Sequence, residues 1–189
     1  AEVLANKNAR AAISMIIDKQ AYCDVILNNG SIPTSTFTPK GLAFDNGKDY
    51  TDLTEGMGYE YNEEQAKELW EKAKEEVGFD TVEMELLTYD HDTGKRTGEY
   101  IQSELSDLEG LTVKVSNLPF KQKLERETNG EFDLAFSGWG ADYPDPLTYL
   151  STMQTGNQFS NQVGYNSEEY NKLIEEAMKL PITEGYAKY

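Results

Sequence analysis

Phe132-Asp-Leu-Ala-Phe-Ser-Gly-Trp-Gly-Ala-Asp-Tyr-Pro-Asp-Pro146 is the stretch on which the interpretation of this chain depends. Its first residues alternate apolar side chains with small or polar ones, as a β-strand does. The strand cannot continue further, because two glycines flank Trp139 and two prolines follow. The stretch therefore predicts a strand that ends in an irregular turn, and this turn carries an indole ring and the carboxyl group of Asp142.

Two further strand-like runs precede this one, at residues 81–88 and 111–118, and helical patterns separate the three runs. The order βαβαβ predicts an α/β fold with a mainly parallel sheet flanked by helices. Parallel strands that are covered on both faces are usually continuously apolar, whereas these alternate, so we expect the helices to cover mainly one face. The apolar positions are Val82, Met84, Leu86, Leu111, Val113 and Val115 in the strands, and Tyr100, Ile101, Leu105, Leu108, Phe120 and Leu124 in the helices.

Further helices are predicted before this region. Apolar residues at helical spacing predict a helix at residues 8–17, and Asp18 is expected to cap a second one that ends at residues 28–30. A capping-box pattern at Asn62 starts a third helix, which Gly78 ends. Its apolar stripe includes Trp70, which we therefore expect in the core.

The remaining segments show less regularity. Residues 31–61 contain several glycines and prolines, and a loop of this length is usually functional or packed against another part of the protein. Residues 146–153 are expected to form a short helix, and residues 154–165 are polar. Ser167 is expected to cap the last long helix, which Pro181 ends.

Composition excludes several classes of function. The 34 acidic and 17 basic residues give a net charge of −17, which argues against nucleic acid or an anionic membrane as the partner. Cys23 is the only cysteine, so neither an intrachain disulfide nor a cysteine-based zinc site is expected. We expect the Cys23 side chain to be buried. No apolar run reaches the roughly 18 residues that span a bilayer. Both ends look cut, and we expect a fragment.

The groups that an enzyme needs are sparse. His91 is the only histidine, and no nucleophile elbow or phosphate-binding glycine loop is found. Asp90, Asp92 and Gly94 match a calcium loop poorly, and a surface turn is the better interpretation. The sequence therefore predicts a protein that is not an enzyme and that holds no cofactor or metal. A hydrolase that uses Asp142 and Asp145 stays as an alternative, although two carboxylates on one loop are poorly placed to face each other.

A binding role is favoured for the turn after the third strand. Ligands of parallel α/β sheets bind beyond the carboxyl ends of the strands, where residues 138–146 and the loop at residues 89–94 are expected. The structural alternative is that Trp139 is a core residue and that Asp142 forms a turn or caps a helix. Composition and placement together favour a ligand site at this turn.

Four stretches of the chain form a recognisable pattern. They are Asn8-Ala-Arg-Ala-Ala-Ile13 with Ile17-Asp-Lys19, the loop from Pro33 to Pro39, Tyr100-Ile-Gln102 with Leu111-Thr-Val-Lys-Val115, and Phe132-Asp133 with Gly138 to Pro146. In this order they resemble the oligopeptide-binding proteins of bacterial ABC importers, which are extracellular solute-binding proteins of family 5 (peptide/nickel type). The resemblance implies that residues 1–189 are a single lobe, the C-terminal lobe of a two-lobe periplasmic-binding-protein-like fold, and that the N-terminal lobe is absent.

The resemblance also implies a function. An oligopeptide would bind in a cleft between the two lobes and be delivered to permease subunits in the membrane, with the receptor in the periplasm or anchored outside the cell as a lipoprotein. Asp142 would receive the α-ammonium of the peptide, with Trp139 nearby. The other residues that the resemblance assigns to the peptide site are Gly138, Gly140, Ala141 and Tyr143.

One departure from the family concerns the peptide's other end. Short-peptide receptors carry arginines for the peptide carboxylate, and Glu127 and Phe136 occupy the matching positions here. This favours longer or differently anchored peptides. Relatives also bind sugars, nickel complexes and haem, so such a cargo is the alternative within the same fold. With one histidine and one cysteine, we do not expect this lobe to hold a metal ion directly.

Overall fold

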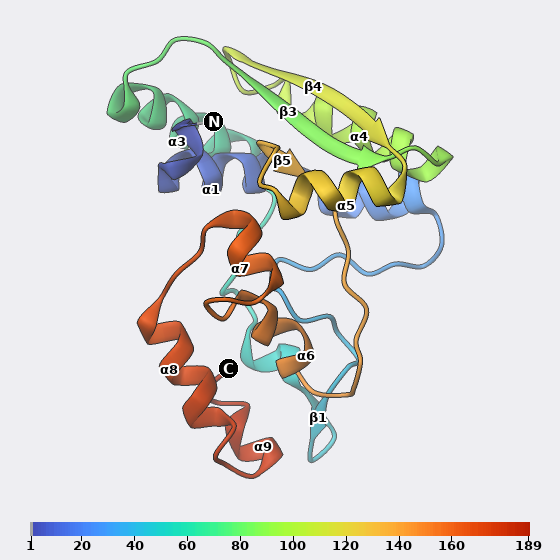
Figure 1. Cartoon of the computed structure of the whole chain (residues 1–189), viewed down its shortest axis with the longest axis vertical. Coiled ribbons are helices and arrows are strands. Elements are labelled where there is room, and N and C mark those ends of the chain that lie inside the picture. Colours follow the sequence, from blue (N-terminus) through green and yellow to red (C-terminus); the bar gives the residue numbers. More distant parts are fainter. Residues whose placement is uncertain (1) are drawn as a thin grey trace. The chain divides into compact units, whose positions relative to one another are not determined.

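The computed structural model describes residues 2–189 (Figure 1). It contains a parallel sheet of three strands. Strand β3 (Val82–Tyr89) lies between β4 (Leu111–Leu118) and β5 (Leu134–Ala135). Helix α4 (Asp92–Leu105) connects β3 to β4, and α5 (Phe120–Thr128) connects β4 to β5. The predicted βαβαβ unit, with a parallel sheet flanked by helices, is therefore confirmed. Strand β5 is shorter than expected, although the Phe136 amide still donates to the Leu87 carbonyl at 2.9 Å.

Alternation along the strands separates an apolar face from a charged one. Met84 and Leu86 are buried in the main core with residues of β4 and three helices. On the opposite face Glu83 pairs with Lys114 at the exposed surface, and Glu85 accepts two hydrogen bonds from Arg126 of α5. The expectation that helices cover mainly one face is therefore met only in part, because α5 lies on the other face, where Leu87 of β3 is fully buried. The main buried core comprises Val3, Ala9, Ala12, Met15, Ile16, Ala66, Trp70, Ala73, Met84, Leu86, Leu105, Leu108, Leu111 and Val113.

The order of the strands explains why α4 and α5 lie on different faces. From β3 the chain moves to one side to form β4, and then returns across β3 to form β5 on the other side. Because both crossovers between parallel strands are expected to be right-handed, this reversal places the two helices on opposite faces. The contacts agree: Gly98 of α4 faces Val115 and Thr88, whereas Arg126 of α5 reaches Glu85.

Two of the helices before the sheet, α2 and α3, begin at the predicted caps, and α1 begins one residue before its predicted start. Their bounds are η1 (Glu2–Ala5), α1 (Lys7–Ile16), α2 (Lys19–Ala21), the π-helical η2 (Tyr22–Leu27) and α3 (Glu63–Val77). The Asp18 side chain accepts from the Ala21 amide at 2.9 Å, and the Asn62 side chain accepts from the Gln65 amide at 3.0 Å. Gly78 ends α3 with φ of 83°, in the left-handed region that favours glycine.

Two single residues lie where the sequence predicts them. Trp70 is fully buried, and its indole Nε1 donates to the Glu109 carbonyl at 2.9 Å, so its polar atom is satisfied inside the core. Cys23 is a buried free thiol. Both are therefore structural residues.

The described chain divides into two compact units, and the sheet belongs to the first. Residues up to 33, 59–127 and 131–137 form the first unit, and residues 34–58, 128–130 and 138–189 form the second. The second unit contains only short strands, β1 (Phe44–Asp45) and β2 (Lys48–Asp49). Its helices are η3 (Tyr50–Leu53), α6 (Leu147–Leu150), η4 (Ser151–Met153), α7 (Gln158–Val163), α8 (Glu168–Ala177) and α9 (Ile182–Gly185).

The segment at residues 31–61, expected to be an irregular loop, contains a small hairpin. Asn46 and Gly47 join β1 to β2 with φ of 48° and 79°, the left-handed conformation that a two-residue hairpin turn requires. The Asn-Gly pair was a usable signal for this turn. Helix α7, in the polar stretch at residues 154–165, was also not predicted. Within residues 2–189 no helix is both long and apolar enough to cross a membrane.

Gly98 is expected to be required for the packing of α4 on the sheet. A Cβ atom at this position would lie 2.6 Å from Val115 Cγ1 and 3.2 Å from Thr88 Cγ2. Alanine normally favours a helix, but overpacking of this kind costs about 1–3 kcal/mol. We therefore expect Gly98→Ala to lower the free energy of unfolding, measured by urea denaturation with Trp70 fluorescence as the probe. An unchanged or higher stability would contradict this packing.

Asp49 is expected to stabilise the second unit in a pH-dependent way. Burial alone would raise the pKa of its carboxyl group, but hydrogen bonds from the Thr51 amide, the Thr51 hydroxyl and the Gly41 amide together lower it. A lowered pKa in the folded state means that this stabilisation is complete above about pH 4, the usual pKa of an aspartate, and is lost as the pH falls through the folded-state pKa.

We therefore expect Asp49→Asn to lower the free energy of unfolding by about 2 kcal/mol at pH 7, because the charge-assisted part of the hydrogen bonds is lost. Urea unfolding at several pH values measures the difference from the parent protein. That difference should shrink as the pH falls below about 4. A difference that is independent of pH would show that the charge of Asp49 does not contribute.

Candidate functional site

The loop after β5 belongs to the second unit and is held by one residue of α6. The indole Nε1 of Trp139 donates to the Thr148 carbonyl at 2.9 Å, and the Asp142 amide donates to the Thr148 hydroxyl at 3.0 Å. Thr148 itself is buried. The Trp139 ring also contacts the ring of Phe159 edge-on, with centroids 5.7 Å apart. Thr148 thus fixes both ends of the segment from Trp139 to Asp142, and sequence analysis did not identify it.

The two aspartates of the loop have different environments. Asp145 Oδ1 accepts a hydrogen bond from the amide of Leu147, the first residue of α6, at 2.8 Å, so the Asp145 carboxylate is engaged in the turn that leads into this helix. Asp142 is exposed, and no donor within residues 2–189 is hydrogen-bonded to its carboxylate. A carboxylate whose backbone is fixed and whose oxygens are free can accept hydrogen bonds from a cationic group. The structural alternative of a turn former or cap therefore fits Asp145 and not Asp142.

Gly138 and Gly140 are not required by the chain itself. Neither has a positive φ, and a Cβ atom added at either position would have no atom within 4 Å. Both residues are exposed, as is Ala141 between them and Asp142. The backbone from Gly138 to Ala141 is therefore open to close approach by another molecule, and glycine permits the closest approach.

A cavity of about 290 Å³ lies next to part of this loop, within the second unit. Of the loop residues, Tyr143 and Asp145 line it. Burial, and then the charges of Asp145 and Asp142, raise the pKa of Tyr143. The remaining lining residues are Leu147, Ala177, Met178, Leu180, Ile182 and Tyr189.

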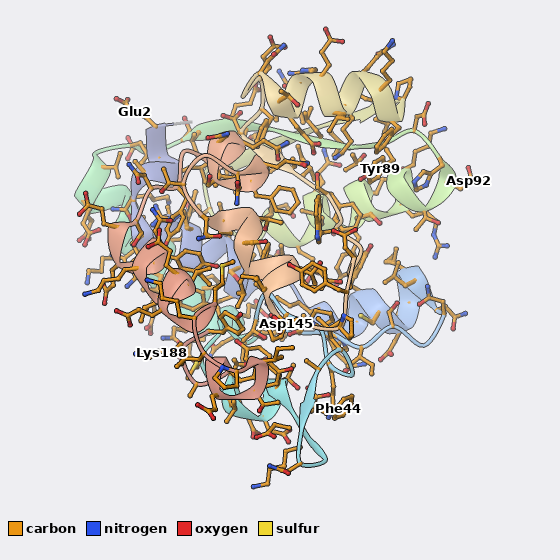
Figure 2. All side chains as sticks on the ribbon, turned by 60° about the horizontal axis from the view of Figure 1, so that its bottom comes forward. Glu2, Phe44, Tyr89, Asp92, Asp145 and Lys188 are labelled. Carbon is orange, nitrogen blue, oxygen red and sulfur yellow. The ribbon has the colours of Figure 1, made fainter. Side chains whose placement is uncertain are left out.

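The loop at the carboxyl end of β3 has a structural role. His91 caps α4, because its Nδ1 accepts from the Gly94 amide at 3.0 Å, and its ring stacks on Tyr89 with centroids 5.3 Å apart. Tyr89 ends β3 and Asp92 begins α4, and Figure 2 labels both. No cluster of three His, Cys, Asp or Glu residues that suits a metal ion occurs in the described part of the chain. The loop is a helix start, which agrees with the predicted surface turn.

Glu127 and Phe136 of the first unit both contact neighbouring side chains, and Phe136 is half-buried. Glu127 is buried and pairs with Lys123, four residues earlier on α5. The Phe136 ring contacts Tyr22 and Tyr89 edge-on, with centroids 6.1 and 6.5 Å apart. Neither side chain is positively charged, so neither position offers a cationic partner for a carboxylate.

Comparison with known proteins gives one consistent result. Residues 1–161 match the family model described as "Bacterial extracellular solute-binding proteins, family 5 Middle". The dipeptide-binding protein of Lactococcus lactis is 32% identical over 95% of this chain and 33% of its own length. A structure of Listeria monocytogenes OppA bound to peptide superposes with a TM-score of 0.90 at 36% identity, over 98% of this chain and 36% of that one.

A relative with a different cargo is more distant. Heme-binding protein A of Haemophilus influenzae is 25% identical over 97% of this chain and 34% of its own length. The chain spans about a third of the length of the curated relatives it matches.

The openness of the loop backbone has a measurable consequence for folding. Because alanine fits at positions 138 and 140 without strain, Gly138→Ala and Gly140→Ala should leave the free energy of unfolding unchanged or raise it by about 0.4–1 kcal/mol. Gly78→Ala is the matched control. It also meets no neighbouring atom, but its φ of 83° makes alanine unfavourable, so stability should fall. Urea denaturation measures all three, and a loss of stability at position 138 or 140 would show that the chain itself needs glycine there.

Proposed function

Because the chain belongs to the bacterial extracellular solute-binding proteins of family 5, we propose that it is part of a receptor that binds oligopeptides and delivers them to the permease of an ABC importer. The family consists of binding proteins and not of enzymes, so the hydrolase alternative with Asp142 and Asp145 is set aside. The peptide-binding relatives support a peptide cargo.

The chain would supply one part of that receptor. In this proposal residues 1–189 belong to the C-terminal lobe, and a second lobe from the longer protein completes the cleft and closes over the peptide by a hinge. This chain covers only about a third of the length of each of these relatives, which supports the proposal that the longer protein supplies a second lobe. The receptor would act outside the cytoplasmic membrane, in the periplasm or anchored as a lipoprotein, where it meets the permease subunits.

The free carboxylate of Asp142 is the observation that carries the proposed binding mode. An α-ammonium has three N–H donors and a positive charge, and a hydrogen bond between such a group and a carboxylate contributes about 1.5–3 kcal/mol. The Thr148 hydroxyl holds the Asp142 amide at 3.0 Å, so the carboxylate is presented on a fixed backbone. A fixed acceptor loses little freedom when the ligand binds, and this favours affinity.

The neighbouring residues suit the peptide main chain and its first side chain. The bare backbone of Gly138, Gly140 and Ala141 allows an extended peptide to approach and to pair by main-chain hydrogen bonds, which gives affinity with little sequence preference. Trp139, which is 36% exposed, and Tyr143 offer aromatic surface to a side chain. The alanine variants at positions 138 and 140 should then bind peptide more weakly although they fold normally.

The positions of Glu127 and Phe136 in the first unit bear on peptide length. The Glu127 carboxylate is already paired with Lys123, and Phe136 is packed among tyrosines. Neither would attract the peptide carboxylate. We infer that the receptor takes longer peptides, or peptides anchored mainly by their amino end. A sugar, a nickel complex or haem is the alternative cargo, for which the haem-binding relative is the precedent, but the exposed Asp142 favours an amine-bearing ligand.

The role of Asp142 can be tested with one peptide in two forms. Mass spectrometry of ligands that co-purify with the full-length receptor identifies a peptide, which is then titrated by calorimetry with its amino terminus free or acetylated. The parent receptor should prefer the free form by about tenfold or more, which corresponds to a hydrogen bond of at least 1.4 kcal/mol. Asp142→Asn should lose most of this preference, because the amide carries no charge.

Asp145→Asn is the matched control, since the Asp145 carboxylate accepts from the Leu147 amide and belongs to the same kind of side chain on the same loop. It should lower the free energy of unfolding slightly and keep the preference for the free amino terminus. Equal affinity of the parent receptor for both forms of the peptide would refute the assignment of Asp142. Co-purification of a sugar or haem and no peptide would refute the proposed cargo.

A further inference from the structure

Two charged side chains of α5 are buried, and both contact the hydroxyl group of Ser137, an exposed residue two positions after β5. Lys123 is 1% exposed and Glu127 is 6% exposed. The Lys123 Nζ donates to Glu127 Oε1 and, at 2.8 Å, to the Ser137 hydroxyl, which in turn donates to Glu127 Oε1. The same Nζ lies 4.4 Å from the ring centroid of Tyr89. We call Lys123, Glu127 and Ser137 the α5 clamp.

Stability alone does not explain the α5 clamp. Removing two charges from water is unfavourable, and apolar residues of similar size in place of a buried ion pair are often equally stable or more stable. Lys123 and Glu127 are four residues apart on one helix, so their pairing needs no tertiary contact. Ser137 is the member that comes from a different element. The specific result of the clamp is therefore to hold Ser137 against α5.

Ser137 is the last residue of the segment 131–137, with which the first unit ends. Strand β5 has only two paired residues, and the hydrogen bond from the Phe136 amide to the Leu87 carbonyl is the one that follows them. Gly138, the next residue, carries no side chain, and no atom lies within 4 Å of the position that a Cβ would take, so no side-chain packing holds the chain at this residue. The α5 clamp thus restrains the chain at the last residue before the open loop.

We propose that Lys123 and Glu127 are positioning residues: through the Ser137 hydroxyl they fix the point from which the loop from Gly138 to Asp142 departs, and thereby raise ligand affinity without contacting the ligand. This inference rests on the proposed function for its effect on affinity, but the restraint of Ser137 is independent of it. Preorganisation acts by removing the entropy that a mobile backbone would lose on binding.

The experiment compares four variants of the full-length receptor. Ser137→Ala removes only the hydroxyl, whereas Ser137→Thr keeps it. The double variant with Lys123→Met and Glu127→Leu replaces the buried pair by apolar side chains. The control carries Glu63→Gln and Lys67→Gln, which remove an exposed pair with the same spacing on α3. Amide hydrogen exchange, urea unfolding and peptide affinity are measured for each.

Ser137→Ala and the apolar double variant should keep the urea midpoint of the parent. In both, exchange at the Phe136 amide should rise about tenfold, the effect of losing one hydrogen bond. The Glu85 amide, which donates to Asp133 Oδ2 at 2.8 Å in the same sheet, serves as the internal reference and should not change. Peptide affinity should fall by about three- to tenfold, as expected for added mobility at one or two residues. Ser137→Thr and the control pair should resemble the parent in every measurement.

Three results would overturn the proposal. Unchanged exchange at Phe136 would show that the clamp does not restrain the chain there. Faster exchange with unchanged affinity would show that the restraint does not reach the binding loop. A fall in affinity that follows a fall in the urea midpoint, with Ser137→Thr no better than Ser137→Ala, would show a role in folding only. If the parent receptor bound no peptide, the proposed function would fail, and the exchange data would still decide whether the clamp restrains Ser137.

Discussion

Parallel pairing of β3 with a strand on each side is the constraint on which the first unit depends. Each parallel neighbour requires a crossover helix, and the reversal of direction after β4 puts α4 and α5 on different faces. The face under α4 is apolar and forms the main core. The face under α5 carries charged groups, among them Glu85 with Arg126 and the buried pair of Lys123 and Glu127. One topological feature therefore determines both where the core lies and where charge is enclosed.

The loop after β5 combines a fixed backbone with free functional groups. The carbonyl and hydroxyl of Thr148 hold Trp139 and the Asp142 amide, while the Asp142 carboxylate remains exposed. In our proposal the α5 clamp adds a restraint at Ser137, just before the loop. Asp145 lies three residues from Asp142 and carries the same carboxyl group. Because one of its oxygens accepts from the Leu147 amide at the start of α6, that group is already engaged within the chain.

Much of the fold was predictable because its signals are local. Caps such as Asp18 and Asn62 satisfy amides within their own first turn, and the alternation at residues 82–86 follows from the pleat of a strand. That the strands are parallel also followed from the order of strands and helices, whereas the central position of β3 was established only by the structure. The hairpin at Asn46 and Gly47 had a local signal as well, which the glycine-rich surroundings obscured. For the candidate site, sequence and family resemblance identified the loop and Asp142 as the group to test.

By itself, then, the sequence determined the α/β class, the βαβαβ order, most helix starts and the family, because each of these is encoded in residues close together along the chain. Only the tertiary structure decided which groups are enclosed and which are free. Thr148 lies on a different element from the two loop residues that it holds, and Ser137 meets Lys123 and Glu127 only because β5 returns beside β3. Such contacts join residues on separate elements, so no local pattern of side chains records them, and the free energy of burial and hydrogen bonding that selects them exists only once the chain has folded.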